Sequence, residues 1–180
     1  MSRPRRPSTP ALDRLTSGER GQLLAEVLTA HPELLDEAEH LALDNLATVD
    51  ADEVAESIEW ALREADADQL AHRAGRVRGR GYVHENEAAR EILQELLQPE
   101  LDDIARRAAL GLHDATRHIA LGLLRGLANC GEDVEAGTVL AYAGPDVTDD
   151  LAWSVRDALE KAGLDLPEEA LEGLSLDSDP

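Results

Sequence analysis

The sequence predicts an all-α protein, on three observations. Leucine and alanine, which both favour helices, dominate the 43% of the 180 residues that are hydrophobic. Apolar residues recur at spacings of three and four along most of the chain, as on one face of a helix. Prolines, glycines and capping residues separate these segments. We therefore expect an irregular helical bundle, or a short α-solenoid of HEAT- or TPR-like helical hairpins, with about eight helices.

The segment from His113 to Cys130 is predicted to form the central helix. Apolar residues cover almost all of its sides, which is typical of a helix buried on several faces. Gly122 and Gly126 are four residues apart, so one stripe of this helix carries no side chains. Another backbone can therefore approach it closely.

Capping residues and prolines place the other helices. The expected starting points are Thr9–Pro10, Thr16, Pro32, Asp50, Asp66, Glu85, Pro99, Thr148 and Pro167. Three glycines among residues 75–81 interrupt the periodicity, so we expect no regular element there. Residues 134–144 fit a short helix or an irregular crossing, and a short strand remains an alternative.

One domain is expected, over residues 9–174, between a disordered basic tail at 1–8 and a disordered acidic tail at 175–180. A single cysteine rules out an internal disulfide and fits a reducing compartment. No apolar run approaches the about 20 residues that span a bilayer. The N-terminal arginines are not followed by the apolar segment of a signal peptide. We expect a cytoplasmic protein that does not bind membranes, with an oligomeric state that the sequence leaves open.

The chain is acidic, with a net charge of −21, but residues 72–80 hold four arginines and no acid, and we call this segment the basic island. Its arginines, with the tyrosine beside them, are the candidate binding residues: Arg73, Arg76, Arg78, Arg80 and Tyr82. Guanidinium groups on a glycine-rich backbone can hold a phosphate or carboxylate, or single-stranded nucleic acid. The alternative is that they pair with the protein's own acidic helices. The negative charge argues against long duplex DNA as a partner.

A metal or catalytic role has one weak set of candidates, namely His113, Asp114 and His118. Asp114 and His118 are four residues apart, so one metal ion could contact both. The simpler interpretation is that Asp114 is a helix-start acid paired with Arg117 or His118. We assign no catalytic residue and expect no cofactor.

Three short segments carry a resemblance to a known group of proteins. They are GRGYV at 79–83, EAA at 87–89 and RRAALGL at 106–112. They resemble uncharacterised actinobacterial α-helical proteins related to the helical regions that accompany SWIM-type zinc fingers, over about residues 20–130. The zinc-finger cysteines are absent, since Cys130 is the only cysteine. The resemblance implies a bacterial, helical, repeat-like interaction module and transfers no functional residue.

The expected function is that of a non-enzymatic α-helical scaffold or adaptor for protein–protein interaction, with the Arg-Gly loop as one means of binding. The expected partner is another protein or a short anionic ligand. The alternative is a nucleic-acid-associated regulator that uses this loop and the N-terminal arginines. A remoter alternative is a small metal-dependent hydrolase.

Overall fold

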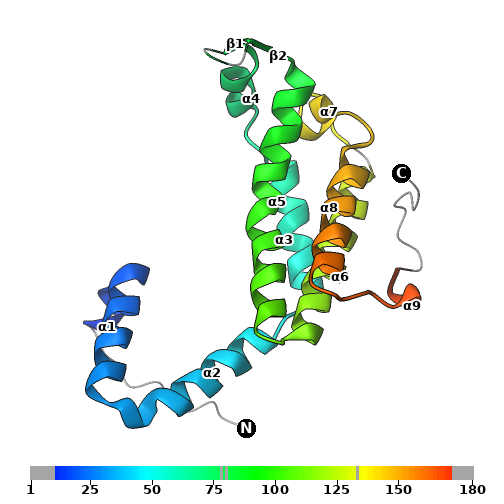
Figure 1. Cartoon of the computed structure of the whole chain (residues 1–180). Helices are drawn as coiled ribbons and strands as arrows, with labels where there is room; N and C mark the ends of the chain where they lie inside the picture. The colour runs from blue at the N-terminus through cyan, green and yellow to red at the C-terminus, as the bar shows by residue number, and fades with distance from the viewer. Residues whose placement is uncertain (1–10, 78, 80, 133, 172–180) are drawn as a thin grey trace. The chain divides into compact units, whose positions relative to one another are not determined.

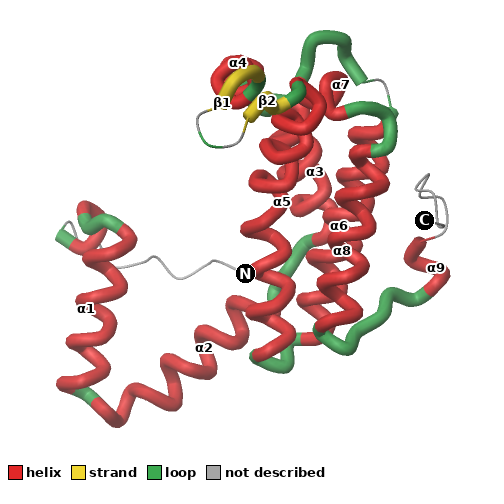
Figure 2. The backbone as a smooth tube through the Cα atoms, turned by 45° about the horizontal axis from the view of Figure 1, so that its top comes forward, coloured by secondary structure: helices red, strands yellow, loops and turns green. Residues whose placement is uncertain are grey.

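The computed structural model describes residues 11–77, 79, 81–132 and 134–171, and helices dominate these residues (Figure 1, Figure 2). The predicted all-α class is therefore confirmed. Contacts divide the chain into two compact units, residues 1–45 and 46–180. The expected tails, and the boundaries of the expected domain at 9 and 174, lie outside the described residues, so the single-domain prediction stays a prediction.

The first unit consists of short helical elements with no core of their own. They are a 3-10 turn (Leu12–Arg14), α1 (Ser17–Ala30), a second 3-10 turn (Pro32–Leu34) and α2 (Leu35–Ala47), which extends two residues past the unit. Thr16 forms the expected capping box, because its hydroxyl accepts from the Glu19 amide and the Glu19 carboxylate accepts from the Thr16 amide at 2.8 Å. No residue from 11 to 45 is buried.

The second unit is a helical bundle. Helices α3, α5, α6 and α8 run side by side, and α4 with a two-stranded hairpin lies near the start of α5 (Figure 1, Figure 2). Its elements are α3 (Ala51–Arg63), α4 (Ala67–Arg73), β1 (Gly75–Val77), β2 (Gly81–Val83), α5 (Glu85–Ala109), α6 (His113–Gly131), α7 (Val139–Ala143), α8 (Val147–Lys161) and α9 (Glu168–Leu171). The segment 134–144 thus contains a short helix.

The predicted central helix is α6, which packs against α3, α5 and α8. Its two glycines allow α3 to approach at backbone distance. A Cβ atom on Gly122 would lie 2.5 Å from the carbonyl oxygen of Ala51 and 2.7 Å from Cβ of Val54. A Cβ atom on Gly126 would lie 2.6 Å from the carbonyl oxygen of Ala55. Real Cβ atoms do not come so close, so α3 can occupy this position only because both residues are glycine.

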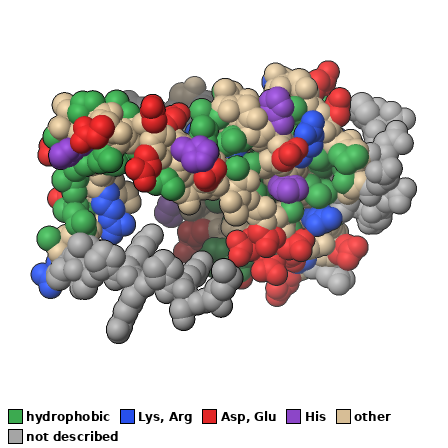
Figure 3. Space-filling view, turned by 90° about the horizontal axis from the view of Figure 1, so that it is seen from below, with side chains coloured by type: hydrophobic (Ala, Val, Ile, Leu, Met, Phe, Trp, Pro, Cys, Tyr) green, Lys and Arg blue, Asp and Glu red, His purple; other side chains and the backbone are tan. Residues whose placement is uncertain are grey.

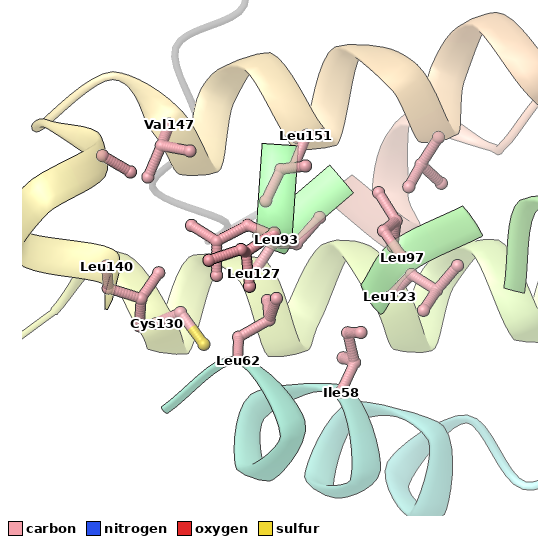
Figure 4. Close-up of a cluster of buried hydrophobic side chains, with 14 of the residues drawn as sticks. Ile58, Leu62, Leu93, Leu97, Leu123, Leu127, Cys130, Leu140, Val147 and Leu151 are labelled. Carbon is pink, nitrogen blue, oxygen red and sulfur yellow. The ribbon is translucent and has the colours of Figure 1, made fainter. Parts of the chain in front are cut away.

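The core of the bundle is aliphatic. Figure 4 shows the side chains that meet between the helices, among them Ile58, Leu62, Leu93, Leu97, Leu123, Leu127, Leu140 and Leu151. All four aromatic residues are exposed: Trp60 at 69%, Tyr82 at 66%, Tyr142 at 43% and Trp153 at 58%. Burial of leucine and isoleucine, at roughly 25 cal/mol per Å² of apolar surface, therefore stabilises the bundle without any ring packing.

The expectation that Pro99 begins a new helix is wrong, because α5 continues through it from Glu85 to Ala109. Pro99 is exposed, so the helix carbonyl that loses its hydrogen bond to the missing N–H can meet water. Leu93, Leu97 and Ile104 lie on both sides of the proline and are all buried in the same core. Their burial holds the two halves of α5 in one helix.

The expectation of no regular element at residues 75–81 is also wrong. β1 and β2 pair as an antiparallel hairpin, with Gly75 opposite Val83 and Arg76 opposite Tyr82. Gly79, in the turn, has a φ of 90°, which other residues rarely adopt. The glycines that break helical periodicity therefore permit the reversal, and Val83 anchors the second strand by burial.

Two smaller boundaries also shift. α8 begins at Val147, so Thr148, the expected start, lies within the helix and is buried. The short helix expected from Thr9 through Leu15 is a single 3-10 turn over its described part, Leu12–Arg14.

We predict that Gly122→Ala destabilises the bundle by about 1–3 kcal/mol in urea unfolding, although alanine is the better helix former. The added methyl group would overlap the backbone of Ala51. Gly21→Ala in α1 is the matched control, because a Cβ atom there meets nothing within 4 Å, and it should leave the unfolding free energy of the bundle unchanged. Equal effects of the two substitutions would contradict the proposed close contact.

Candidate functional site

Arg73 pairs with the protein's own helix. Its Nη1 and Nη2 atoms donate to the two carboxylate oxygens of Glu95 on α5, at 2.7 and 2.8 Å. These hydrogen bonds lower the pKa of Glu95 and raise the pKa of Arg73. A bidentate pair of this kind occupies the N–H donors that an anionic ligand would need. For Arg73, the geometry favours the alternative of an internal counter-charge.

Arg76 and Tyr82 are brought together by the hairpin. They are direct partners in the register of β1 and β2, and both are exposed. The Tyr82 ring lies edge-on to the ring of His84, with centroids 5.1 Å apart. Arg78 and Arg80 lie outside the described residues. The described part of the island thus offers one exposed guanidinium group beside an exposed aromatic ring.

The weak metal candidates are at the N-terminal end of α6, and His113, Asp114 and His118 are all exposed. Asp114 accepts a hydrogen bond from Nη1 of Arg117 at 3.1 Å, as the simpler interpretation expects. Over the described ranges, no group of three or more histidine, cysteine, aspartate or glutamate side chains is arranged to hold a metal ion.

Cys130 lies at the end of α6 inside the core, with no exposed surface. Its Sγ donates to the main-chain oxygen of Glu59 at 3.8 Å. Burial raises the pKa of the thiol to about 11, so the reactive thiolate form is scarce near neutral pH.

We predict that the free energy of unfolding falls as the pH rises from about 9 to about 11, and that Cys130→Ala removes this part of the pH dependence. The thiol of the unfolded chain loses its proton near 8.5, whereas the folded chain keeps its proton until about 11, so alkaline pH favours the unfolded state. Urea unfolding at several pH values measures the slope. Identical slopes for the two proteins would contradict the buried, neutral thiol.

Several arginines connect different helices of the bundle through hydrogen bonds and ion pairs. Each donates to a carbonyl or carboxylate oxygen that is distant in sequence, as in Arg63 to the Asn129 carbonyl at 2.7 Å, Arg125 to Asp52 at 2.9 Å and Arg90 to the Ala143 carbonyl at 2.9 Å. Arg90 also pairs with Asp150 on α8, and Arg107 donates to the Leu46 carbonyl. These four arginines are therefore engaged in holding the bundle together.

A groove of about 330 Å³ lies between α3 and α5. Its lining includes Glu100, Asp103 and Arg107 of α5. Burial, together with the neighbouring Asp103 carboxylate, raises the pKa of Glu100. Burial also acts to raise the pKa of Asp103, but hydrogen bonds from Arg106 and Arg107 outweigh it and lower that pKa. In this groove the charge of Asp103 is balanced by the two arginines, whereas the charged form of the neighbouring Glu100 is disfavoured.

An unusual surface is formed by the first unit. Its large apolar side chains are exposed on α1, on α2 and in the turn between them, and we call them the N-terminal apolar surface: Leu24 (55%), Val27 (38%), Leu34 (38%), Leu35 (49%) and Leu41 (54%). Eight acidic residues and two arginines lie among residues 11–45. In Figure 3, exposed apolar side chains (green) and acidic ones (red) are both visible on the surface.

Sequence reasoning assigned these leucines to amphipathic helices but did not identify them as an open surface. Composition gave no signal for this, because seven of the 13 residues of α2 are apolar, the same number as in α3, which is part of the core. Exposure itself depends on what the rest of the chain covers, and the local pattern does not contain this information.

Comparison with known proteins gives no relative. No protein-family model matches the chain, and neither a curated protein nor a solved structure matches it. The resemblance to helical regions accompanying SWIM-type zinc fingers therefore stays an expectation. In the part of the chain that the structure describes, no helix has the length and apolar character needed to cross a membrane.

Proposed function

We propose that this protein is a non-enzymatic, cytoplasmic helical adaptor that binds another protein through its N-terminal apolar surface. The observation that supports this proposal is that no residue from 11 to 45 is buried, although these residues form two helices. Leu24, Leu35 and Leu41 are each about half exposed. Several large apolar side chains exposed within one small unit, on a polar background, are typical of interaction sites.

The helices of this unit have a reason to need a partner. α1 has 14 residues and α2 has 13, lengths at which an isolated helix is marginally stable in water. Helices in proteins gain most of their stability from packing an apolar face, and within this unit that packing is slight. A partner that covers Leu24, Leu35 and Leu41 would bury apolar surface and stabilise both helices together.

The charge of the unit indicates what kind of protein binds. Eight acidic residues against two arginines surround the N-terminal apolar surface. A second copy of the chain would place one acidic surface against another, which electrostatic repulsion disfavours. A partner with an amphipathic segment, apolar on one side and rich in lysine and arginine around it, is complementary in both respects.

We predict that the combined Leu24→Ser, Leu35→Ser and Leu41→Ser variant binds its partner at least about tenfold more weakly, a loss of about 1.4 kcal/mol. Partners are captured with the full chain from cells that express it, purified, and titrated by calorimetry. Binding of the unchanged chain should weaken as salt increases.

The matched control is Trp60→Ser with Trp153→Ser, which removes two exposed apolar side chains from the bundle. Both variants should keep the melting temperature of the bundle, because none of the five residues is buried. A captured partner that binds the leucine variant as tightly as the unchanged chain would contradict the proposal.

A second candidate is binding of an anionic ligand by the hairpin, which the pairing of Arg76 with Tyr82 favours. An exposed aromatic ring beside a guanidinium group suits a nucleic-acid base and its phosphate. Such a ligand would be a short single strand, because the net charge of −21 opposes long duplex DNA.

We predict for this candidate that replacing Arg76, Arg78 and Arg80 with serine weakens binding of a fluorescent single-stranded oligonucleotide and flattens its salt dependence, by a slope of about 0.7 per lost phosphate contact. Fluorescence anisotropy measures both, and Arg20→Ser is the control of equal charge change per site. A lower melting temperature with unchanged binding would instead identify these arginines as internal counter-charges.

A further inference from the structure

Arg156, on α8, differs from the other partly buried arginines. Its Nε–H group is buried and has no acceptor, and the side chain makes no ion pair with any described residue. Every other partly buried arginine in the described ranges has at least one hydrogen-bond partner: Arg63, Arg73, Arg90, Arg107, Arg117 and Arg125. Buried donors without acceptors are uncommon and destabilising, so this one needs an explanation.

Arg156 lines a pocket of about 330 Å³ between α6, α8 and the segment that leads to α9. The apolar part of the lining consists of leucines: Leu124, Leu159, Leu164, Leu166 and Leu171. Leu124, Leu159 and Leu164 are buried, so the pocket floor is part of the core. The volume is at the lower end of the roughly 300–1,000 Å³ of small-molecule sites.

The pocket has two carboxylates as well, and they restrict the ligand. Glu160 and Asp165 are lining residues, both exposed, and neither forms an ion pair with Arg156. Their charge would repel a dianion more strongly than a monoanion. The segment that carries Asp165 is tied to α6, since Nε of Arg117 donates to the Asp165 main-chain oxygen at 3.1 Å.

The guanidinium group of Arg156 indicates that the ligand carries an anionic group. The Nε atom has no exposed surface, but Arg156 as a whole is only partly buried and lines the pocket, which leaves its terminal nitrogens to contact an anion. A guanidinium group binds a planar carboxylate through two parallel N–H···O bonds. An inorganic anion would leave the leucines uncovered, whereas a neutral apolar molecule would leave the cation without a counter-charge.

We propose that this pocket binds a short aliphatic carboxylate, with the carboxylate on Arg156 and the hydrocarbon chain among the leucines. The site lies in the bundle and is independent of the N-terminal apolar surface, so it adds a small-molecule ligand to the proposed adaptor. A ligand there would join α8 to the end of α9 through Leu171 and would supply a counter-charge to Arg156.

The probe is octanoate, compared with octanamide, which has the same chain and no charge. Calorimetry on the full-length chain should give saturable octanoate binding with a dissociation constant below about 1 mM, and at least about tenfold weaker binding of octanamide. Amide NMR should place the largest shifts at Leu159, Leu164 and Arg156.

Three variants test the role of the guanidinium group. Arg156→Gln should weaken octanoate binding at least about tenfold and leave octanamide binding unchanged. Arg156→Lys should bind octanoate with intermediate strength, because lysine keeps the positive charge but cannot form the bidentate hydrogen bonds of a guanidinium group. Arg20→Gln, with the same charge change in the first unit, should bind as the unchanged chain does.

The proposal is overturned if octanoate does not bind, if octanamide binds equally well, or if the NMR shifts lie elsewhere. Circular dichroism checks that each variant folds. Should Arg156→Gln fail to fold, the octanoate–octanamide comparison on the unchanged chain still decides the matter.

Discussion

The close contact between α3 and α6 is the constraint on which the bundle depends. Gly122 and Gly126 let the backbone of α3 touch α6, and this places Ile58 and Leu62 in the core. Polar contacts fix the register at both ends of the same contact, with Asp52 bound by Arg125 and Arg63 bound to the carbonyl of Asn129. Because α5 and α8 pack on the other sides of α6, a shift of α3 would require the whole core to repack.

Charge has two separate roles in this chain. Within the bundle, arginines such as Arg63 and Arg125 join helices, while the first unit keeps an acidic surface around exposed leucines. The net charge of −21 is thus a property of the outer surface more than of the contacts that hold the bundle together. Such a division fits the adaptor proposed above, whose N-terminal helices would meet a basic partner.

Features that depend on local chemistry could be predicted from the sequence. The caps at Thr16 and Asp50, the central helix and its glycine stripe all follow from neighbouring residues. The continuity of α5 through Pro99 and the hairpin could not be predicted, because burial of Leu93, Leu97 and Ile104 against other helices and pairing of two strands decide them. The candidate sites also differ in whether neighbouring or distant residues determine them. The basic island is visible in the sequence, but the Glu95 partner of Arg73 and the missing partner of Arg156 depend on segments that meet only in the fold.

The aliphatic core also determines how this protein can be observed. Trp60 and Trp153 are already in water in the folded state, so their fluorescence will change little on unfolding. No aromatic ring is held in the core, so the near-ultraviolet circular dichroism of the native protein will be weak. By these two optical criteria the folded chain would resemble a molten globule, in which side-chain packing is lost. Its tertiary order is accessible instead through the methyl resonances of its buried leucines.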